Sequence, residues 1–222
     1  VAPAKNLDPQ KRAKKVIKYG QCTACHTHSP KLPFYANWPV IGDVVKQDAA
    51  LAIREFDANI IINGIKENQP IDEVTLNKLE YSFQNETMPP LKYYVAHWGT
   101  VINPNEKEIV LNWIKEYRAK HHYNGLASTE FTNEPIQVIP DSIPVDPAKV
   151  ALGRMLYNDV RLSVDNTISC ASCHDLSKGG TDNKPFSEGV GGQFGGINAP
   201  TVFNATFNFV QFWDGRAANL AA

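Results

Sequence analysis

The chain of 222 residues has little of what marks a membrane protein, a disulfide-rich protein or a nucleic-acid-binding protein. It contains no run of about 18 apolar residues, so no membrane-spanning helix is predicted. Its 22 lysines and arginines nearly balance 23 aspartates and glutamates, and no concentrated basic face predicts binding to nucleic acid. Only four cysteines occur, and all four belong to one repeated pattern, which leaves none for a structural disulfide.

The chain also lacks a starting methionine and a signal peptide, since it begins at Val1. This start is typical of a trimmed mature product, so we expect a removed targeting segment and allow for a membrane anchor in the precursor. Hydrophobic residues make up 43% of the chain, which is enough to bury a core. Its length suits one large domain or two domains of about 100 residues each.

The cysteines form two copies of the pattern Cys-x-x-Cys-His. In c-type cytochromes the two thiols of this pattern form thioethers with the haem vinyl groups, and the histidine binds the iron. We therefore expect two covalently bound haem c groups. The residues that would hold them are Cys22, Cys25 and His26 in the first copy and Cys170, Cys173 and His174 in the second.

Two other interpretations of this pattern are weaker. A redox dithiol requires a Cys-x-x-Cys at the end of a strand, whereas helical patterns precede both copies. Structural zinc requires four ligands close in space, but the pairs that start at Cys22 and Cys170 are 148 residues apart. A local zinc site that adds His28 to the first copy would have crowded and unusual spacing.

Helix start signals recur along the chain. An Asp or Asn that can cap a helix precedes apolar residues at helical spacing, and in three cases Pro occupies the first helical position. These capping residues are Asp8, Asp72, Asn103 and Asp146. A short helix thereby leads toward each Cys-x-x-Cys-His copy. The sequence predicts an all-α chain.

Residues 121–147 interrupt the helical pattern with two histidines, a glycine and four prolines. Such a stretch predicts a Pro-rich linker. The chain is therefore predicted to contain two cytochrome c-like haem domains: an N-terminal domain of residues 1–120 and a second, incomplete domain of residues 148–222.

The second ligand of each iron decides what a haem can do. In the first domain Met88 lies in a polar loop before two prolines, which hold the backbone extended, and we predict that it binds the iron opposite His26. His97 is the competing candidate. Because Met/His ligation raises the reduction potential, this haem suits an electron donor that relays electrons to the second haem.

The second domain offers no comparable ligand. After His174 the remaining 48 residues contain neither His nor Met. Met155 lies on an apolar helix face, where we expect it to be part of the core. The second haem is therefore predicted to keep an open iron that admits a small molecule. The glycine-rich run of residues 189–196 is either a surface loop or a loop that approaches this haem.

Four separated blocks of the second half resemble the peroxidatic half of the bacterial dihaem cytochrome c peroxidases, over residues 146–220. In the first half, Met88-Pro89-Pro90 and His97-Trp98-Gly99 are similar to the extra N-terminal haem domain of the three-haem branch, which includes membrane-anchored quinol peroxidases. The four blocks are Leu152–Ser163, Ile168–His174, Ile197–Asn204 and Gln211–Ala217.

The resemblance implies roles for three residues. His174 would be the proximal ligand of the haem that reduces hydrogen peroxide. Trp213 would lie on the electron path between haems, with core packing as the ordinary alternative. Asn198 would help to bind a calcium ion, with the capping of a turn before Pro200 as its alternative.

The sequence departs from the family pattern at two places. Many dihaem relatives carry a ligating histidine where this chain has Val190, Gly191 and Gly192, so we expect a permanently open haem instead of one opened by reduction. The chain also stops at Ala222, before the positions of the catalytic glutamate and glutamine and of a third haem motif. We expect a truncated chain.

The sequence thus predicts a periplasmic haem peroxidase that reduces hydrogen peroxide to water with electrons from quinol or a small redox donor. The alternative is a multihaem electron-transfer cytochrome without catalysis. A protein-modifying oxidase on the same scaffold is a third interpretation.

Overall fold

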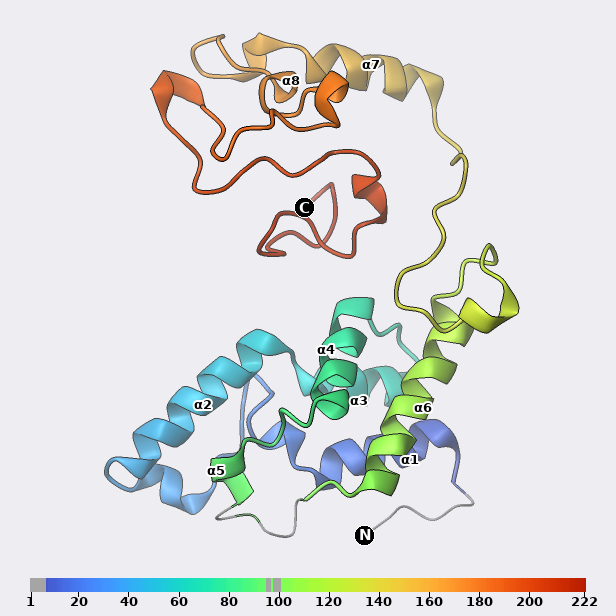
Figure 1. The fold of residues 1–222 in the computed structure, drawn as a ribbon. Helices are drawn as coiled ribbons and strands as arrows, with labels where there is room; N and C mark the ends of the chain where they lie inside the picture. The colour runs from blue at the N-terminus through green and yellow to red at the C-terminus, as the bar shows by residue number, and fades with distance from the viewer. Residues whose placement is uncertain (1–6, 95–96, 98–100) are drawn as a thin grey trace. The chain divides into compact units, whose positions relative to one another are not determined.

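The computed structural model describes residues 7–94, 97 and 101–222, and the chain divides into two compact units, Val1–Val138 and Ile139–Ala222 (Figure 1). Regular structure in the described residues is helical, with two isolated β-bridges and no strand. This confirms the all-α prediction. Within the described residues, no helix combines the length and the apolar character needed to cross a bilayer.

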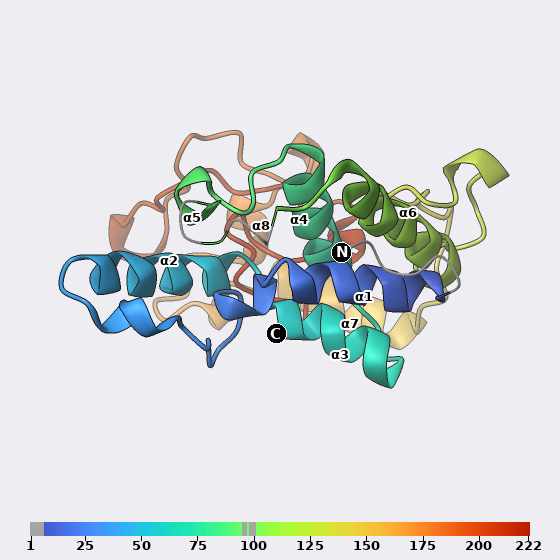
Figure 2. The same ribbon diagram turned by 90° about the horizontal axis from the view of Figure 1, so that it is seen from below.

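Unit 1, the part of the chain up to Val138, is a bundle of helices. Helix α1 packs against α3 and α6, while α4 packs against α6 (Figures 1 and 2). Helix α2 packs instead against the short 3-10 turn Phe34–Asn37. The helices are α1 (Pro9–Tyr19), α2 (Ile41–Glu55), α3 (Ala58–Glu67), α4 (Glu73–Gln84), α5 (Leu91–Tyr94) and α6 (Pro104–His121).

The predicted start signals act as helix caps. The Asp8 carboxylate accepts hydrogen bonds from the first backbone N–H groups of α1, and Asp72 does the same for α4. At α6, Asn103 and Glu106 form a reciprocal capping box, with both hydrogen bonds 3.0 Å long. These bonds satisfy N–H groups that have no partner inside the helix, which fixes where each helix begins.

The core of unit 1 lies between α1, α3, α4 and α6. Burying one such aliphatic or aromatic side chain contributes about 1.5–3 kcal/mol, so this cluster dominates the stability of the unit. The chain leaves the core at the C-terminal end of α1, directly before the first Cys-x-x-Cys-His copy. The buried cluster comprises Ala13, Val16, Ile17, Ile61, Ile71, Leu76, Leu79, Phe83, Val110, Trp113, Ile114 and Tyr117.

A buried charge network joins α4 to α6. Arg118 is 1% exposed, and its Nε donates to Glu73 Oε1 at 2.8 Å. One guanidinium nitrogen also lies 2.6 Å from Glu80 Oε2. Each buried charge thus has a hydrogen-bonded partner of opposite sign, which offsets part of the cost of removing it from water.

Unit 2, residues 139–222, consists mostly of loops around α7 (Pro147–Tyr157) and α8 (Cys170–Cys173). Asp146 caps α7 as predicted. The expectation that Met155 belongs to a core is wrong, because its side chain is 69% exposed and α7 has no buried residue. Within residues 139–222 the elements next to α7 are short turns and loops, and no second long helix covers its apolar face.

Candidate haem sites

The first Cys-x-x-Cys-His copy follows α1 closely, with only Gly20 and Gln21 between them. The 3-10 turn Cys22–Ala24 comes two residues after the helix end, and the backbone N–H of His26 donates to Cys22 O at 2.9 Å. The two thiols and the imidazole therefore lie on one tight turn. This turn is attached to the core of unit 1 through α1.

The imidazole of His26 is oriented by the segment between α2 and α3. Its side chain is 7% exposed and stacks on Phe56, with ring centroids 4.4 Å apart. Its Nδ1 lies 3.3 Å from Phe56 O. Because a carbonyl can only accept a hydrogen bond, the neutral ring carries its proton on Nδ1, which leaves the Nε2 lone pair for a metal. Burial also lowers the pKa of His26, which favours this neutral form.

The surroundings of the two thiols of the first copy disfavour a redox pair. Burial raises the pKa of Cys22 to about 11 and also raises the pKa of Cys25. A redox-active dithiol requires a lowered pKa, because the thiolate is the nucleophile. His28, the extra ligand of the zinc interpretation, is exposed and its Nε2 lies 3.8 Å from Asp57. Among the described residues, no three His, Cys, Asp or Glu side chains form a group that could hold a metal ion.

The second copy is built on a single helical turn. Cys170 and Cys173 are the first and last residues of α8, and residues three apart on a helix face the same side. The side chain of Ser169 and that of Ser172 form a capping box that starts this short helix. The backbone N–H of His174 donates to Cys170 O at 3.0 Å, as the corresponding group does in the first copy.

His174 is oriented in the same way as His26. Its Nδ1 lies 3.0 Å from Pro200 O and 3.3 Å from Gly180 O, two groups that can only accept. The Tyr157 hydroxyl at the end of α7 donates to the backbone carbonyl of His174. The proton is thus held on Nδ1, and Nε2 is again the atom left for a metal.

Residues 179–181 and residues 199–202 are held together by hydrogen bonds, which fixes the positions of the Gly180 and Pro200 carbonyls. We call these two segments the clamp. Thr201 Oγ1 donates to Gly179 O at 2.6 Å, and Thr181 Oγ1 donates to Ala199 O at 3.0 Å. Gly180 has a φ of +76°, and a Cβ there would lie 3.0 Å from Val202. Glycine is therefore required at this position both by its backbone conformation and by the close approach of the two segments.

Trp213 and Asn198, which the sequence analysis singled out separately, contact each other. The indole Nε1 of Trp213 donates to Asn198 O at 3.1 Å. Trp213 is 61% exposed, so it is not a core residue of this unit. Its predicted place on an electron path and the predicted calcium role of Asn198 stay predictions.

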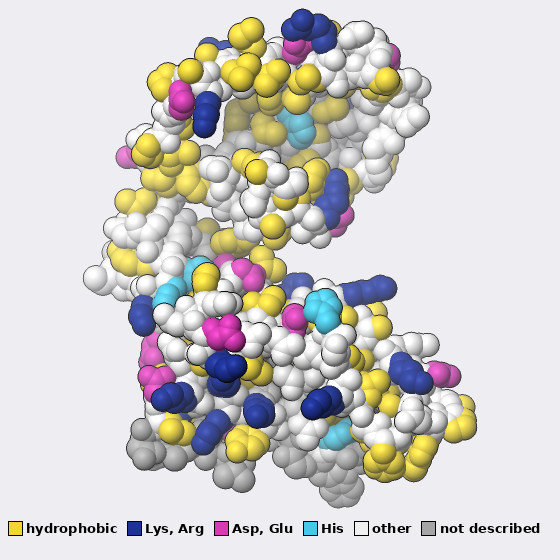
Figure 3. Space-filling model, turned by 180° about the vertical axis from the view of Figure 1, so that it is seen from behind, with side chains coloured by type: hydrophobic (Ala, Val, Ile, Leu, Met, Phe, Trp, Pro, Cys, Tyr) yellow, Lys and Arg dark blue, Asp and Glu magenta, His cyan; other side chains and the backbone are white. Residues whose placement is uncertain are grey.

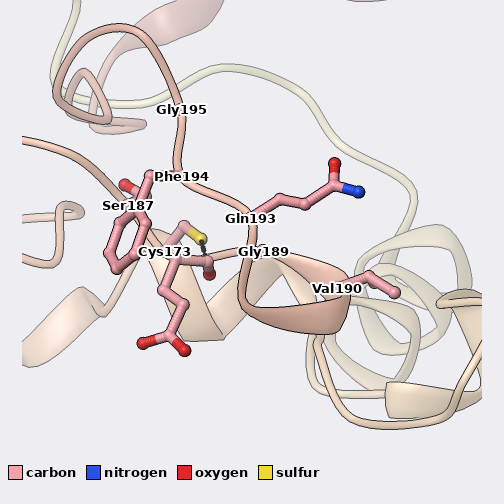
Figure 4. Close-up of a pocket in the computed structure, with 8 residues that line it drawn as sticks. Cys173, Ser187, Gly189, Val190, Gln193, Phe194 and Gly195 are labelled. Atoms are coloured by element: carbon pink, nitrogen blue, oxygen red, sulfur yellow. Dashed lines mark hydrogen bonds between the residues drawn. The ribbon is translucent and has the colours of Figure 1, made fainter.

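A cavity of about 510 Å³ lies beside the second copy (Figure 4). The glycine-rich run closes on itself, since Gly189 N–H donates to Gln193 O and Gly195 N–H donates to Ser187 O. The Cys173 sulfur lies 3.9 Å from Glu188 O. Of the two interpretations of this run, the structure favours a loop that approaches the second site. The cavity is lined by Cys173, Ser187, Glu188, Gly189, Val190, Gln193, Phe194 and Gly195.

The two candidates for the second ligand of the first haem have different surroundings. Met88 is exposed in the loop after α4, and its place as an iron ligand stays a prediction. His97 contacts protein groups through both ring nitrogens: Nε2 lies 2.9 Å from the Tyr35 hydroxyl and Nδ1 lies 3.1 Å from Tyr93 O. Both tyrosines lie in aromatic pairs of the sequence, Phe34-Tyr35 and Tyr93-Tyr94, but their contacts with His97 were not predicted.

Both sites fit a covalently bound haem c. Each presents two thiols and one histidine on a single turn, and each histidine has its Nδ1 directed at a backbone carbonyl, as in metal-binding histidines generally. The raised thiol pKa values and the exposed His28 do not fit the dithiol and zinc interpretations.

Comparison with known proteins supports this result. Residues 147–222 match the family described as "Di-haem cytochrome c peroxidase", and residues 2–116 match the "Haem-binding domain" family. The chain is 45% identical over 199 residues to "Cytochrome c peroxidase Ccp" of Escherichia coli K12, which covers 90% of this chain and 43% of that protein.

Further relatives match shorter stretches of the chain. "Cytochrome c551 peroxidase" of Nitrosomonas europaea is 54% identical over 88 residues, or 40% of this chain and 26% of the relative. "Methylamine utilization protein MauG" of Methylorubrum extorquens is 40% identical over 83 residues, or 37% of this chain and 24% of the relative. The chain spans less than half the length of these relatives. The chain therefore belongs to the "Haem-binding domain" family, and its second half is similar to the di-haem cytochrome c peroxidases.

Proposed function

We propose that this chain supplies two haem sites of a peroxidase that reduces hydrogen peroxide to water. The observation that carries the proposal is the orientation of His174 by residues 198–202, within the region that matches the di-haem peroxidase family. Because His26 is oriented in the same way, peroxide reduction is assigned to the site of His174 on its position within residues 147–222, the part similar to the di-haem peroxidases.

Haem c would be held by the same residue types at both sites: by Cys22, Cys25 and His26 at one, and by Cys170, Cys173 and His174 at the other. When bound, it would supply one-electron transfer at the first site and reduction of peroxide at the second. Each histidine would bind the iron through Nε2 and keep its proton on Nδ1, where the backbone carbonyl would make the ring a stronger ligand.

The other residues have supporting roles in this proposal. Met88 would bind the iron opposite His26 and make that site an electron relay. Trp213 would lie on the electron path toward the second site, and Asn198 would contribute to a calcium site. The acid/base group that assists cleavage of the O–O bond and a third haem would lie in sequence that this chain does not contain, as expected from its match to 43% of the Escherichia coli relative. Quinol or a small redox donor would supply electrons, and the location would be the periplasm.

Spectroscopy of the ferric full-length protein tests the proposal. If the site of His174 has an open iron, adding cyanide or hydrogen peroxide shifts its absorption and its electron paramagnetic resonance signal. Two low-spin haems that respond to neither reagent would instead indicate an electron-transfer cytochrome without catalysis. A protein-modifying oxidase is tested by turnover with quinol and peroxide alone, which such an enzyme would not support.

The proposed relay is tested by Met88→Ala in the full-length protein. We expect loss of the low-spin signal of the first haem, a lower reduction potential and slower peroxide turnover, because the thioether ligand is removed. The matched control is Met155→Ala, which changes the chain's other, exposed methionine. Unchanged spectra in Met88→Ala would contradict the ligand assignment.

A further inference from the structure

A continuous set of aromatic and polar contacts leads from the surface of unit 1 to the first Cys-x-x-Cys-His copy. The Tyr35 hydroxyl lies 2.9 Å from His97 Nε2, and the His97 ring stacks on Tyr93 with centroids 3.9 Å apart. The Tyr93 hydroxyl donates to Gln21 Oε1 at 3.0 Å, and Gln21 directly precedes Cys22. Burial raises the pKa of Tyr35 and Tyr93, which keeps both hydroxyl groups protonated.

The hydrogen bonds of this cluster have a defined direction. Tyr93 O is a carbonyl and only accepts, so His97 Nδ1 donates to it at 3.1 Å. The Nε2 atom of the neutral ring is then an acceptor, and the Tyr35 O–H donates to it. The oxygen of Tyr35 keeps lone pairs that can accept a hydrogen bond from a further O–H group. Tyr35 is therefore arranged to take a proton on one side and pass its own proton to His97 on the other.

An exposed aromatic face, formed by Phe34 and Trp38, lies beside Tyr35. Phe34 is 74% exposed and Trp38 is 53% exposed, and their rings meet edge to face with centroids 5.6 Å apart. Phe34 also contacts the ring of Tyr35 at 5.5 Å. Figure 3 shows hydrophobic side chains gathered at the end of unit 1 that carries this turn and α2. Stacking and edge contacts on such a face favour a flat aromatic ligand.

The backbone beside this face is strained. Val40, directly before α2, has a φ of +66° and is exposed, which is rare for a β-branched residue. Strained residues of this kind cluster at ligand sites, where the surrounding structure holds them.

We propose that Tyr35 and His97 form the proton-accepting pair for a quinol that docks on Phe34 and Trp38. The inference rests on the proposed function, in which electrons reach the haem held by Cys22, Cys25 and His26. For each electron that passes to this haem, one O–H bond of the quinol breaks and its proton moves to the Tyr35 oxygen, while Tyr35 passes its own proton to His97 Nε2. After two such transfers the quinol is a quinone, and two protons have left through His97 to water.

The experiment compares a quinol with a donor that releases no proton. In the full-length holoprotein, reduction of the first haem is followed by stopped-flow absorbance, with menadiol as one donor and hexaammineruthenium(II) as the other. Tyr35→Phe and His97→Gln are the test variants. Tyr81→Phe, which changes an exposed tyrosine of α4, is the matched control.

We expect reduction by menadiol to slow at least ~10-fold in both test variants, the low end of what proton transfer by a positioned side chain contributes. Reduction by hexaammineruthenium(II) should not change, and Tyr81→Phe should match the wild type with both donors. The wild type should also react more slowly with menadiol in D₂O, and the variants should lose part of that isotope effect.

Three results would overturn the inference. Equal slowing with both donors would mean that the pair only supports the haem site. Loss of the low-spin spectrum in His97→Gln would make His97 an iron ligand. A wild type that menadiol does not reduce would exclude the quinol site, yet peroxide consumption with hexaammineruthenium(II) would then leave the peroxidase proposal standing. Failure of the proposed function would give a different result: peroxide would reoxidise neither haem, whichever of the two donors had reduced it.

Discussion

Each of the two proposed haem-binding histidines depends on a backbone carbonyl that is distant in sequence. His26 uses the carbonyl of Phe56, 30 residues later, and His174 uses that of Pro200, 26 residues later. The pentapeptide pattern identifies the ligands, because their chemistry is local. It contains nothing about the carbonyls, because any residue can supply one and only the fold brings it near. For the same reason the Tyr35–His97 contact, which joins residues 62 apart, could not be predicted from the sequence.

At the residue scale, the Arg118 network gives the sharpest stability prediction. Arg118→Leu leaves Glu73 and Glu80 without their cation inside the bundle. We expect the free energy of unfolding of unit 1 to fall by about 3–5 kcal/mol, as for other broken buried pairs. Urea denaturation followed by the fluorescence of tryptophan, which is buried at position 113, measures this loss.

The control for this variant is Lys107→Leu, which breaks a pair with Glu86 that is 3.1 Å long and largely exposed on the Glu86 side. Its effect should stay below about 1 kcal/mol, because exposed pairs contribute little. Equal losses in the two variants would contradict the importance given to the buried network.

At the scale of elements, capped helices were predictable and the others were not. Asp8, Asp72, Asn103 and Asp146 each accept from the N–H groups that the sequence analysis expected them to cap. Helix α2 escaped prediction because Val40 precedes it without any capping side chain. Its start depends instead on packing, since Gly42 lies so close to Ala36 O that a Cβ would be 2.4 Å away. Helix α3 did carry a signal in Asp57, which caps it.

The capping box of α6 can be tested with two asparagines, one at the N-cap and one inside the helix. Asn103→Ala removes the side chain that accepts from Glu106 N–H, and we expect a loss of about 1 kcal/mol in the unfolding free energy of unit 1. Asn112→Ala changes an exposed position inside the same helix and should be neutral or slightly stabilising, because Ala has the higher helix propensity. If both variants lower the denaturation midpoint equally, loss of the capping box is not the reason for the lower stability of Asn103→Ala.

The clamp around His174 is tested by two glycines of unit 2. Gly180→Ala forces a Cβ against Val202 at a positive φ, and we expect a loss of about 1–3 kcal/mol in unfolding free energy. The spectrum of the haem at His174 should change while that of the haem at His26 does not. Gly153→Ala, inside α7 with open space around it, should stabilise the helix by up to about 1 kcal/mol. A Gly180→Ala protein with both spectra unchanged would contradict the positioning role of the clamp.

At the scale of the whole molecule, the boundary between the two units lies after Val138, whereas the predicted linker spans 121–147. The first part of that stretch belongs to unit 1, because His122 Nε2 contacts Ile71 O at 2.9 Å and the Asn124 side chain donates to Val138 O at 2.7 Å. A high proline content indicates that a segment is not helical, but it does not say whether side-chain hydrogen bonds attach that segment to a neighbour.

The segment that remains between the units should be the most sensitive to proteases. Residues 141–146 are exposed and have no helix or strand, and such backbone is cut first. Brief digestion of the whole chain with proteinase K should yield two fragments that meet within these residues, as mass spectrometry would show. First cuts inside α6 or α7 would contradict this division of the chain.

The long sequence separation between each histidine and its carbonyl has a consequence for the order of biogenesis. A chain that emerges N-terminus first exposes His26 before Phe56 exists outside the exit channel, and it exposes His174 before Pro200. Each pentapeptide is therefore available to an attachment enzyme while its imidazole can still turn freely. We expect each ring to reach its final orientation only after the later segment has folded against it, so the attachment of haem would not require an aligned imidazole.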